Sequence, residues 1–183
     1  MQAIPKYTPR WPFDATRVAD FLDLGVVWDR IPADKNGAIA AMILPTEREI
    51  IINQDVPGLR GGYGESTLAH EIGHWELHIN HQAVGQIIER QSGGLEVSLQ
   101  PFLCRNAIGT LQKVEWQAQY FSSCLLMPRS ILESKRKGRD LTKYKHLQAM
   151  AVDMGVTVAN LKYRLKDLGW IYIAPDSRRI YIN

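Results

Sequence analysis

The chain has 183 residues, 45% of them hydrophobic and 22% charged, with a formal net charge of +3 at pH 7. This is the composition of a globular protein of about one domain, which can bury a core without disulfide or metal support. Its two cysteines, Cys104 and Cys124, exclude a disulfide framework and lack the CxxC spacing of a zinc ribbon, so we expect reduced thiols. The N-terminus lacks the apolar core of a signal peptide, and no apolar run reaches about 18 residues, which predicts a cytoplasmic protein without a membrane span.

The N-terminal third predicts a short helix followed by a small sheet. DATRVADFLDLG reads as a helix that Asp14 can cap and Gly25 can end. VVWDRIP reads as a strand stopped by Pro32, and the apolar runs AIAAMILP and REIIIN read as a hairpin or as two adjacent strands. A loop rich in glycine and proline then leads into the next helix, for which Ser66 is a candidate N-cap.

The stretch TLAHEIGHWELH, residues 67–78, predicts a helix that is apolar on more than one side and therefore largely buried. Its main apolar face consists of Leu68, Ile72, Trp75 and Ile79. An adjacent stripe carries His70, His74 and His78, one helical turn apart each time. Buried imidazoles need partners, because an unsatisfied buried polar group is costly, and a metal ion is one such partner.

The motif HExxH occupies residues 70–74 of this helix. The i, i+4 spacing points the imidazoles of His70 and His74 to one side, close enough to share a zinc ion. Glu71 then lies beside the metal, where it can accept a proton from the attacking water. The alternative is a packed helix in which the histidines bond to backbone carbonyls.

A catalytic zinc site needs a third protein ligand. His78 is unsuited, because it lies about 12 Å along the helix axis from His70, so it is either a group behind the ligands or a core histidine. The metzincin extension is absent, since Leu77 and Asn80 replace its glycine and third histidine. Glu115 is the candidate. A second helix is expected from near residue 111 to Pro128, and Glu115 is the acidic start of a helical face that continues with small residues. That face also contains Ala118, Gln119 and Ser122. A surface carboxylate at a helix start is the alternative.

HEIGHWELH followed by EWQAQYFSSCLLMP resembles the ImmA/IrrE family of zinc metallopeptidases, whose second signature is ExxAxxFAxxLLMP. Ser122 replaces the usual alanine of that signature. The resemblance covers roughly residues 14–135 and implies His70, His74 and Glu115 as zinc ligands and Glu71 as general base, the arrangement of gluzincins. It also implies a cytosolic bacterial or phage protein that relieves repression by cleaving a helix-turn-helix repressor. Residues 82–111, which lack clear periodicity and read as a long irregular excursion, depart from the family pattern.

The chemistry that follows is metal-assisted hydrolysis of a peptide bond. Zinc activates water and polarises the scissile carbonyl, while Glu71 accepts the water proton and passes it to the leaving amine. Tyr120, on the ligand helix, and Tyr63, in the glycine loop, are candidate donors to the oxyanion. A tyrosine in either place is more often a packing residue, which is the alternative for both.

The C-terminal third is basic, with 12 Lys/Arg and 5 Asp/Glu in residues 129–183, a net of +7, against 10 and 14 before it, a net of −4. It reads as helix, turn at Gly155, helix and hairpin, which resembles a winged helix-turn-helix. DNA reading would use exposed side chains of the second helix, namely Asn160, Lys162, Tyr163, Arg164 and Lys166. Protein docking, plain packing or a merely solvated basic face are the alternatives.

These observations predict an α+β protein with zincin-like active-site helices packed on a small β-sheet and a C-terminal winged-helix-like helix pair and hairpin. We expect a zinc metallopeptidase domain at 1–135 and the helix-turn-helix-like region at 136–183. The predicted function is a zinc endopeptidase that cleaves a helix-turn-helix repressor in a bacterial stress or mobile-element circuit. The competing interpretation is a non-proteolytic regulator that binds DNA or protein and holds a structural or vestigial zinc site. Nucleic acid ranks below the repressor as a partner.

Overall fold

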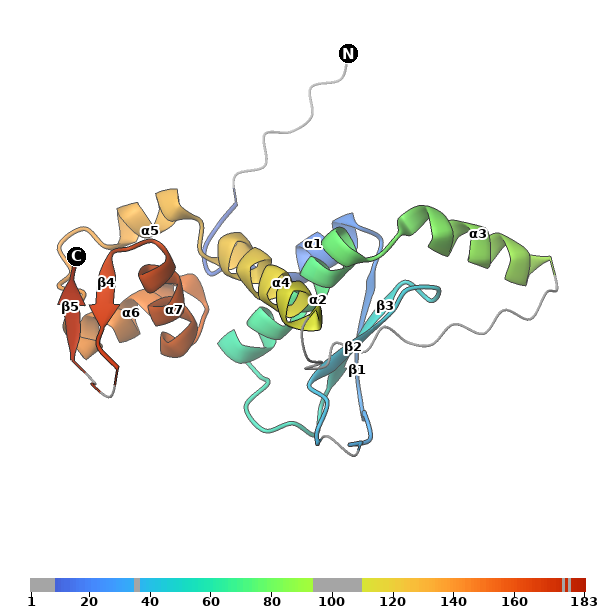
Figure 1. Cartoon of the computed structure of the whole chain (residues 1–183), viewed down its shortest axis with the longest axis horizontal. Helices are drawn as coiled ribbons and strands as arrows, with labels where there is room; N and C mark the ends of the chain where they lie inside the picture. The colour runs from blue at the N-terminus through green and yellow to red at the C-terminus, as the bar shows by residue number, and fades with distance from the viewer. Residues whose placement is uncertain (1–8, 35–36, 94–109, 176, 178) are drawn as a thin grey trace, which may run out of the picture.

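The computed structural model describes residues 9–34, 37–93, 110–175, 177 and 179–183 (Figure 1). Within these ranges the chain is a mixed α+β protein of seven helices and five short strands, which confirms the predicted class. The helix α1 (Thr16–Phe21) begins the described fold, and Asp14 accepts a hydrogen bond from the Thr16 amide at its start. No helix of the described residues is long and apolar enough to cross a membrane.

Three strands form the main sheet in the order β1-β3-β2. The strands are β1 (Gly25–Asp29), β2 (Ala41–Leu44) and β3 (Glu49–Asn53). β2 and β3 pair as the antiparallel hairpin that the two apolar runs predicted, and β1 joins β3 in parallel. Burial alternates along β2 and most of β3, because Ile43, Ile50 and Ile52 point into the core while Met42, Leu44, Glu49 and Ile51 are partly exposed; Asn53 at the end of β3 is buried as well.

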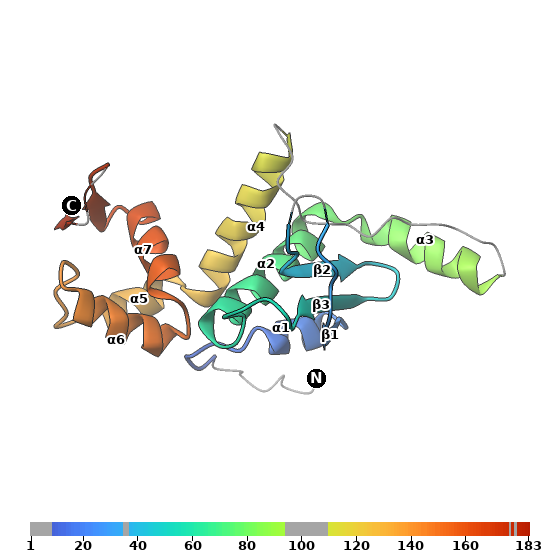
Figure 2. The same ribbon diagram turned by 90° about the horizontal axis from the view of Figure 1, so that it is seen from below.

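The two long helices of the protein are α2 (Gly62–His78) and α4 (Thr110–Leu126), which lie against each other beside the sheet (Figures 1 and 2). Their backbones approach closely because small residues face one another: a Cβ added to Gly73 would lie 3.1 Å from the Cα of Ala118. The predicted N-cap of α2 is wrong. The helix begins after Gly61, whose φ of 79° suits glycine, and Ser66 lies inside it with its hydroxyl donating to the Gly62 carbonyl.

The segment after α2 is more regular than its sequence predicted. Residues His81–Ser92 form helix α3, with the Asn80 side chain accepting a hydrogen bond from the Ala83 amide at its N-terminus. Both views show α3 extending away from the rest of the fold (Figures 1 and 2). The irregular excursion predicted for 82–111 is therefore wrong for its first part, and residues 94–109, with Cys104, lie outside the described residues.

The C-terminal region has the predicted helix pair and hairpin. Its elements are α5 (Arg129–Lys135), α6 (Tyr144–Met154), α7 (Val158–Asp167), β4 (Ile171–Ile173) and β5 (Ile180–Ile182). Gly155 ends α6 in the left-handed conformation, and the Thr157 hydroxyl caps α7 by accepting from the Asn160 amide. β4 and β5 pair antiparallel.

This region packs directly on the helices that carry the HExxH and Glu115 motifs. A Cβ on Gly62 would lie 2.7 Å from the backbone of Val156, so the start of α2 touches the turn between α6 and α7. The buried Arg164 of α7 donates to the Met127 carbonyl after α4. One cluster of buried residues accordingly includes side chains from the sheet, from α2 and from α6 and α7.

Candidate metal centre

The helix α2 positions the three residues of the HExxH motif. His74 is fully buried, Glu71 is 3% exposed, and His70 is partly exposed at the side of α2 that faces α4. Ile72 and Trp75, on the opposite side of the helix, are buried in the core and hold this orientation. Because successive turns place residues i and i+4 above one another, the rings of His70 and His74 stand edge to face, with centroids 4.7 Å apart.

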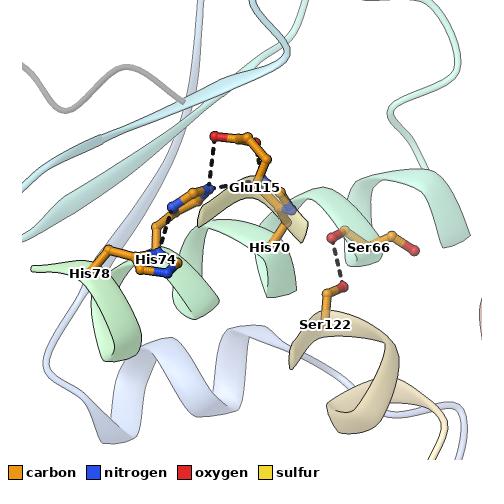
Figure 3. Close-up of polar contacts among 6 residues, drawn as sticks. All are labelled: Ser66, His70, His74, His78, Glu115 and Ser122. Carbon is orange, nitrogen blue, oxygen red and sulfur yellow. Dashed lines mark hydrogen bonds and ion pairs between the residues drawn. The ribbon is translucent and has the colours of Figure 1, made fainter. Parts of the chain in front are cut away.

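Glu115 reaches this pair of imidazoles from α4 (Figure 3). Its Oε2 lies 3.2 Å from Nε2 of His70, and its Oε1 lies 3.5 Å from Nε2 of His74. The two Nε2 atoms are 3.0 Å apart. The predicted third ligand therefore lies beside the first two, although it is 45 residues from His70 in the sequence.

The donor set fits a divalent transition metal. One ligand atom from each of His70, His74 and Glu115 lies within 4.8 Å of the others, a group that could hold a metal ion. Ligands at 2.0–2.2 Å in a tetrahedral zinc site are about 3.3–3.6 Å from one another. The Nε2 atoms of His70 and His74 are 3.0 Å apart, and they lie 3.2 Å and 3.5 Å from the two different oxygens of the Glu115 carboxylate, so the three groups are close enough to share one ion. Two imidazoles and one carboxylate leave a fourth position open, as a catalytic site requires.

The electrostatics of the cluster also favour the forms that bind metal. Burial raises the pKa of Glu115, but interactions with the His70 and His74 imidazoles outweigh it and bring that pKa down to about 2, so the carboxylate is ionised. Burial lowers the pKa of His74, and its neighbours His70 and His78 act in the same direction against the attraction of Glu115. A neutral imidazole beside an ionised carboxylate is the state that a metal ion needs.

These groups open into a cleft of about 530 Å³. His70, Glu71 and Glu115 line it from α2 and α4, and the segment 37–41 leading into β2 lines the other side. Glu71 thus meets the cleft beside the ligand group while most of its side chain is buried.

The two candidate oxyanion donors lie in different places. Tyr63 belongs to the first turn of α2 and lines the cleft with the ligand group, rather than lying in the preceding loop. Tyr120 lines an adjoining cavity of about 500 Å³ between α4 and α7, where it stacks on Trp116 and faces the Arg164 guanidinium. Both rings are partly exposed, at 43% and 42%.

Two of the five side chains predicted to read DNA from α7 make contacts within the protein instead. Arg164 is 5% exposed and Asn160 donates to the Ser66 hydroxyl of α2, so these two side chains are engaged within the protein. Tyr163 and Lys166 are exposed, and Lys162 is partly so. The prediction that all five side chains are exposed is therefore wrong for Arg164, because the carbonyl of Met127 draws the guanidinium inward.

Two residues lie at the site although the sequence did not predict them there: Gln117 was not singled out, and Asn160 was expected to face DNA. Gln117 lies two positions after Glu115 and accepts a hydrogen bond from His78. Asn160 lines the cleft from α7, 94 residues after its partner Ser66. The helical projection of α4 could have drawn attention to Gln117, but no local spacing predicts the contact of Asn160.

No protein-family model matches this chain. No curated protein matches its sequence either.

Proposed function

We propose that the protein is a zinc endopeptidase of the gluzincin type, with His70, His74 and Glu115 as zinc ligands and Glu71 as general base. The observation that carries the proposal is the meeting of His70, His74 and Glu115, whose ligand atoms lie within 4.8 Å of one another, at a cleft that Glu71 also lines from outside the ligand group. A purely structural site would close with a fourth protein ligand and would have no use for a carboxylate at its edge. We extend the proposal to the arrangement of the fold, as zincin-like helices with a winged-helix-like C-terminal region.

Each residue has a distinct task in the proposed reaction. Zinc, when bound, supplies Lewis-acid chemistry: it lowers the pKa of water and polarises the scissile carbonyl. Glu71 accepts the proton of the attacking water and later delivers it to the leaving amine. Tyr63 lines the cleft from the first turn of α2 and is the better placed of the two tyrosines to donate a hydrogen bond to the oxyanion.

The proposed substrate is a helix-turn-helix repressor. This part rests on the resemblance of HEIGHWELH and EWQAQYFSSCLLMP to the ImmA/IrrE family. The cleft is compatible with a polypeptide, since it runs beside the segment 37–41 and is lined by polar groups from three elements. The engagement of Arg164 and Asn160 inside the protein weighs against direct DNA reading by α7 and in favour of protein docking.

The decisive experiment compares the wild type with Glu71→Gln on helix-turn-helix repressors from the genome that carries this gene. Zinc-loaded wild type should cut one of these repressors at one site, identified by mass spectrometry. Glu71→Gln should hold as much zinc and keep its fold but lose cleavage, because glutamine has nearly the same shape and cannot accept a proton. Undiminished cleavage by Glu71→Gln would refute the general-base role, and loss of its zinc would make Glu71 a structural residue.

A further inference from the structure

His78 lies directly behind the ligand His74, on the side away from Glu115 (Figure 3). Its Nδ1 is 3.0 Å from Nδ1 of His74, and its Nε2 is 3.0 Å from Oε1 of Gln117. His74 in turn presents Nε2 to the ligand group. Three side chains therefore form one continuous hydrogen-bonded chain that starts on α4, crosses to α2 and ends at the proposed metal position.

The direction of every hydrogen bond in this chain follows from its Gln117 end. An amide oxygen only accepts, so Nε2 of His78 carries the proton and donates. Nδ1 of a neutral His78 is then a bare acceptor, which requires Nδ1 of His74 to carry its proton and donate. A neutral His74 with its proton on Nδ1 carries a lone pair rather than a proton on Nε2, the atom that faces His70 and Glu115.

We propose that His78 and Gln117 are positioning residues that fix His74 in the tautomer and ring orientation that bind metal. The inference rests on the metal site of the proposed function. It assigns a role to His78, the third histidine of the helix, for which the sequence allowed two interpretations: a core histidine or a group behind the ligands. It also gives α4 two contacts with the same site, Glu115 to the ligand group and Gln117 to the hydrogen bonds behind it.

The opposite orientation of the Gln117 amide would reverse each donor. The amide nitrogen would donate to Nε2 of His78, Nδ1 of His78 would donate to His74, and the proton of His74 would move to Nε2. His74 could then bind a metal through Nε2 only after losing the proton on that atom. Moving this proton to Nδ1 would break the hydrogen bond from His78. A partner at Gln117 that can only accept therefore favours binding, and this makes the chain testable residue by residue.

The substitutions separate hydrogen bonding from bulk. His78→Leu fills the space but offers no acceptor, whereas His78→Asn keeps an oxygen near the place of Nδ1. Gln117→Glu keeps an acceptor and removes the donor, whereas Gln117→Leu removes both. His146 provides the control, because it lies on α6 and bonds to the Asp140 amide, away from the cleft. His146→Leu should leave Zn²⁺ affinity unchanged.

The measurement is Zn²⁺ affinity by competition with a chromophoric chelator, using the full chain. His78→Leu should bind Zn²⁺ about 10–100-fold more weakly, the usual effect of losing the partner behind a ligating histidine. His78→Asn and Gln117→Glu should remain close to the wild type. Gln117→Leu should fall between, because Gln117 is exposed and water can replace its oxygen. Equal affinity of His78→Leu and the wild type would overturn the proposal.

A second readout needs no metal and no activity. In metal-free protein with ¹⁵N-labelled histidine, the two ring nitrogens of His74 should give the shifts of the Nδ1–H tautomer, and His78→Leu should lose that preference. Retention of the same tautomer in His78→Leu would show that His78 merely packs. If wild-type protein bound no Zn²⁺, the proposed function would fail, whereas the ¹⁵N spectra would still decide whether the hydrogen-bonded chain exists.

Discussion

Gly73 of α2 lies against Ala118 of α4, so closely that a Cβ on Gly73 would be 3.1 Å from both the Cα and the carbonyl oxygen of Ala118. Gly73 directly precedes His74 and lies about one turn after His70, and Ala118 lies about one turn after Glu115, so this contact sets how near the ligand-bearing parts of the two helices come. The separation of the ligand atoms therefore depends on two residues that bind nothing.

The first prediction concerns this contact. Ala118 is fully buried, so Ala118→Leu should force α4 away from α2, at a cost of about 1–3 kcal/mol in the free energy of unfolding. Zn²⁺ affinity should fall with it, because Glu115 moves with α4. Thermal unfolding of the metal-free protein and a Zn²⁺ titration measure the two effects. Ala149→Leu, at an exposed position of α6, is the matched control and should change neither.

The second prediction concerns Glu115 as the third ligand. Glu115→Ala should lower the zinc content after dialysis against a weak chelator. Its loss of Zn²⁺ affinity should exceed the 10–100-fold that is typical when a residue hydrogen-bonded to a ligand is removed. Glu115→Gln should also lose zinc, because it keeps an oxygen but not the negative charge. Glu76→Ala removes an exposed carboxylate from α2 and should retain full occupancy. Equal zinc content in all four proteins would make Glu115 an ordinary surface carboxylate.

The third prediction separates the two tyrosines. Tyr63 lines the cleft with Glu71 and His70, whereas Tyr120 lines the neighbouring cavity and stacks on Trp116. Tyr63→Phe should therefore reduce kcat for a peptide substrate, by as much as about 10²–10³-fold if its hydroxyl meets the oxyanion. Tyr120→Phe should leave kcat nearly unchanged. The reverse ranking would transfer the role to Tyr120.

The helix that carries the HExxH motif was predictable because it depends on local spacing, whereas spacing alone left Glu115 between a metal ligand and a surface carboxylate. The family resemblance implied the ligand, because its contact with His70 spans 45 residues of sequence. The i, i+4 spacing places His70 and His74 on one side of the helix, and the small residues that follow Glu115 allow a close neighbour. The C-terminal helix pair and hairpin were predictable for the same reason: apolar residues recur at helical spacing, and Gly155 and Thr157 mark the turn.

The features missed from the sequence depend on tertiary contacts or on weak apolar patterns. Helix α3 has few apolar residues, of which only Val84 is buried, although the Asn80 cap was a signal for it. The burial of Arg164 depends on a carbonyl 37 residues away, at Met127, which no helical projection contains. The role of Ser66 was misassigned because glycine, not serine, precedes α2.

The fourth prediction concerns pH and Glu65. Burial raises the pKa of Glu65 and the charge of Asp14 adds to it, against a lowering contribution from the Ala15 amide that donates to its carboxylate. The folded protein thus holds this proton more tightly than the unfolded chain, whose value is near 4.5. Stability is gained from this group in acid and is lost as the pH rises through the folded pKa. Glu65→Gln should remove that loss.

Urea unfolding at several pH values tests this sign. Glu65→Gln should be more stable than the wild type at neutral pH, and the difference should shrink below pH 4.5, where Glu65 is protonated in both states. Gln can still accept the hydrogen bond of the Ala15 amide, so the start of α1 should remain in place. A difference that is constant across pH would show that the carboxylate is not responsible.

The fifth prediction concerns the basic C-terminal region as a docking surface for the repressor. Truncation before α6 is unsuitable as a test, because Leu147, Met150 and Leu161 belong to the same buried cluster as the sheet and α2. Charge reversal at exposed positions keeps the core. Lys137, Lys143 and Lys145 are exposed, and none of them lines the cleft.

The triple variant with glutamate at Lys137, Lys143 and Lys145 should cleave the full repressor more slowly, with a weaker dependence on salt, because complementary charge mainly speeds encounter and is screened by ions. Cleavage of a short peptide that spans the scissile bond should be unchanged, since the peptide needs only the cleft beside Glu71. Charge reversal of Arg60 and Arg90, which are exposed outside this region, is the control.

If the triple variant instead lost only the salt-dependent binding of a nonspecific DNA duplex, nucleic acid would be the partner of this surface. Repressor cleavage that ignores both salt and charge reversal would leave the net charge of +7 as a solvated face.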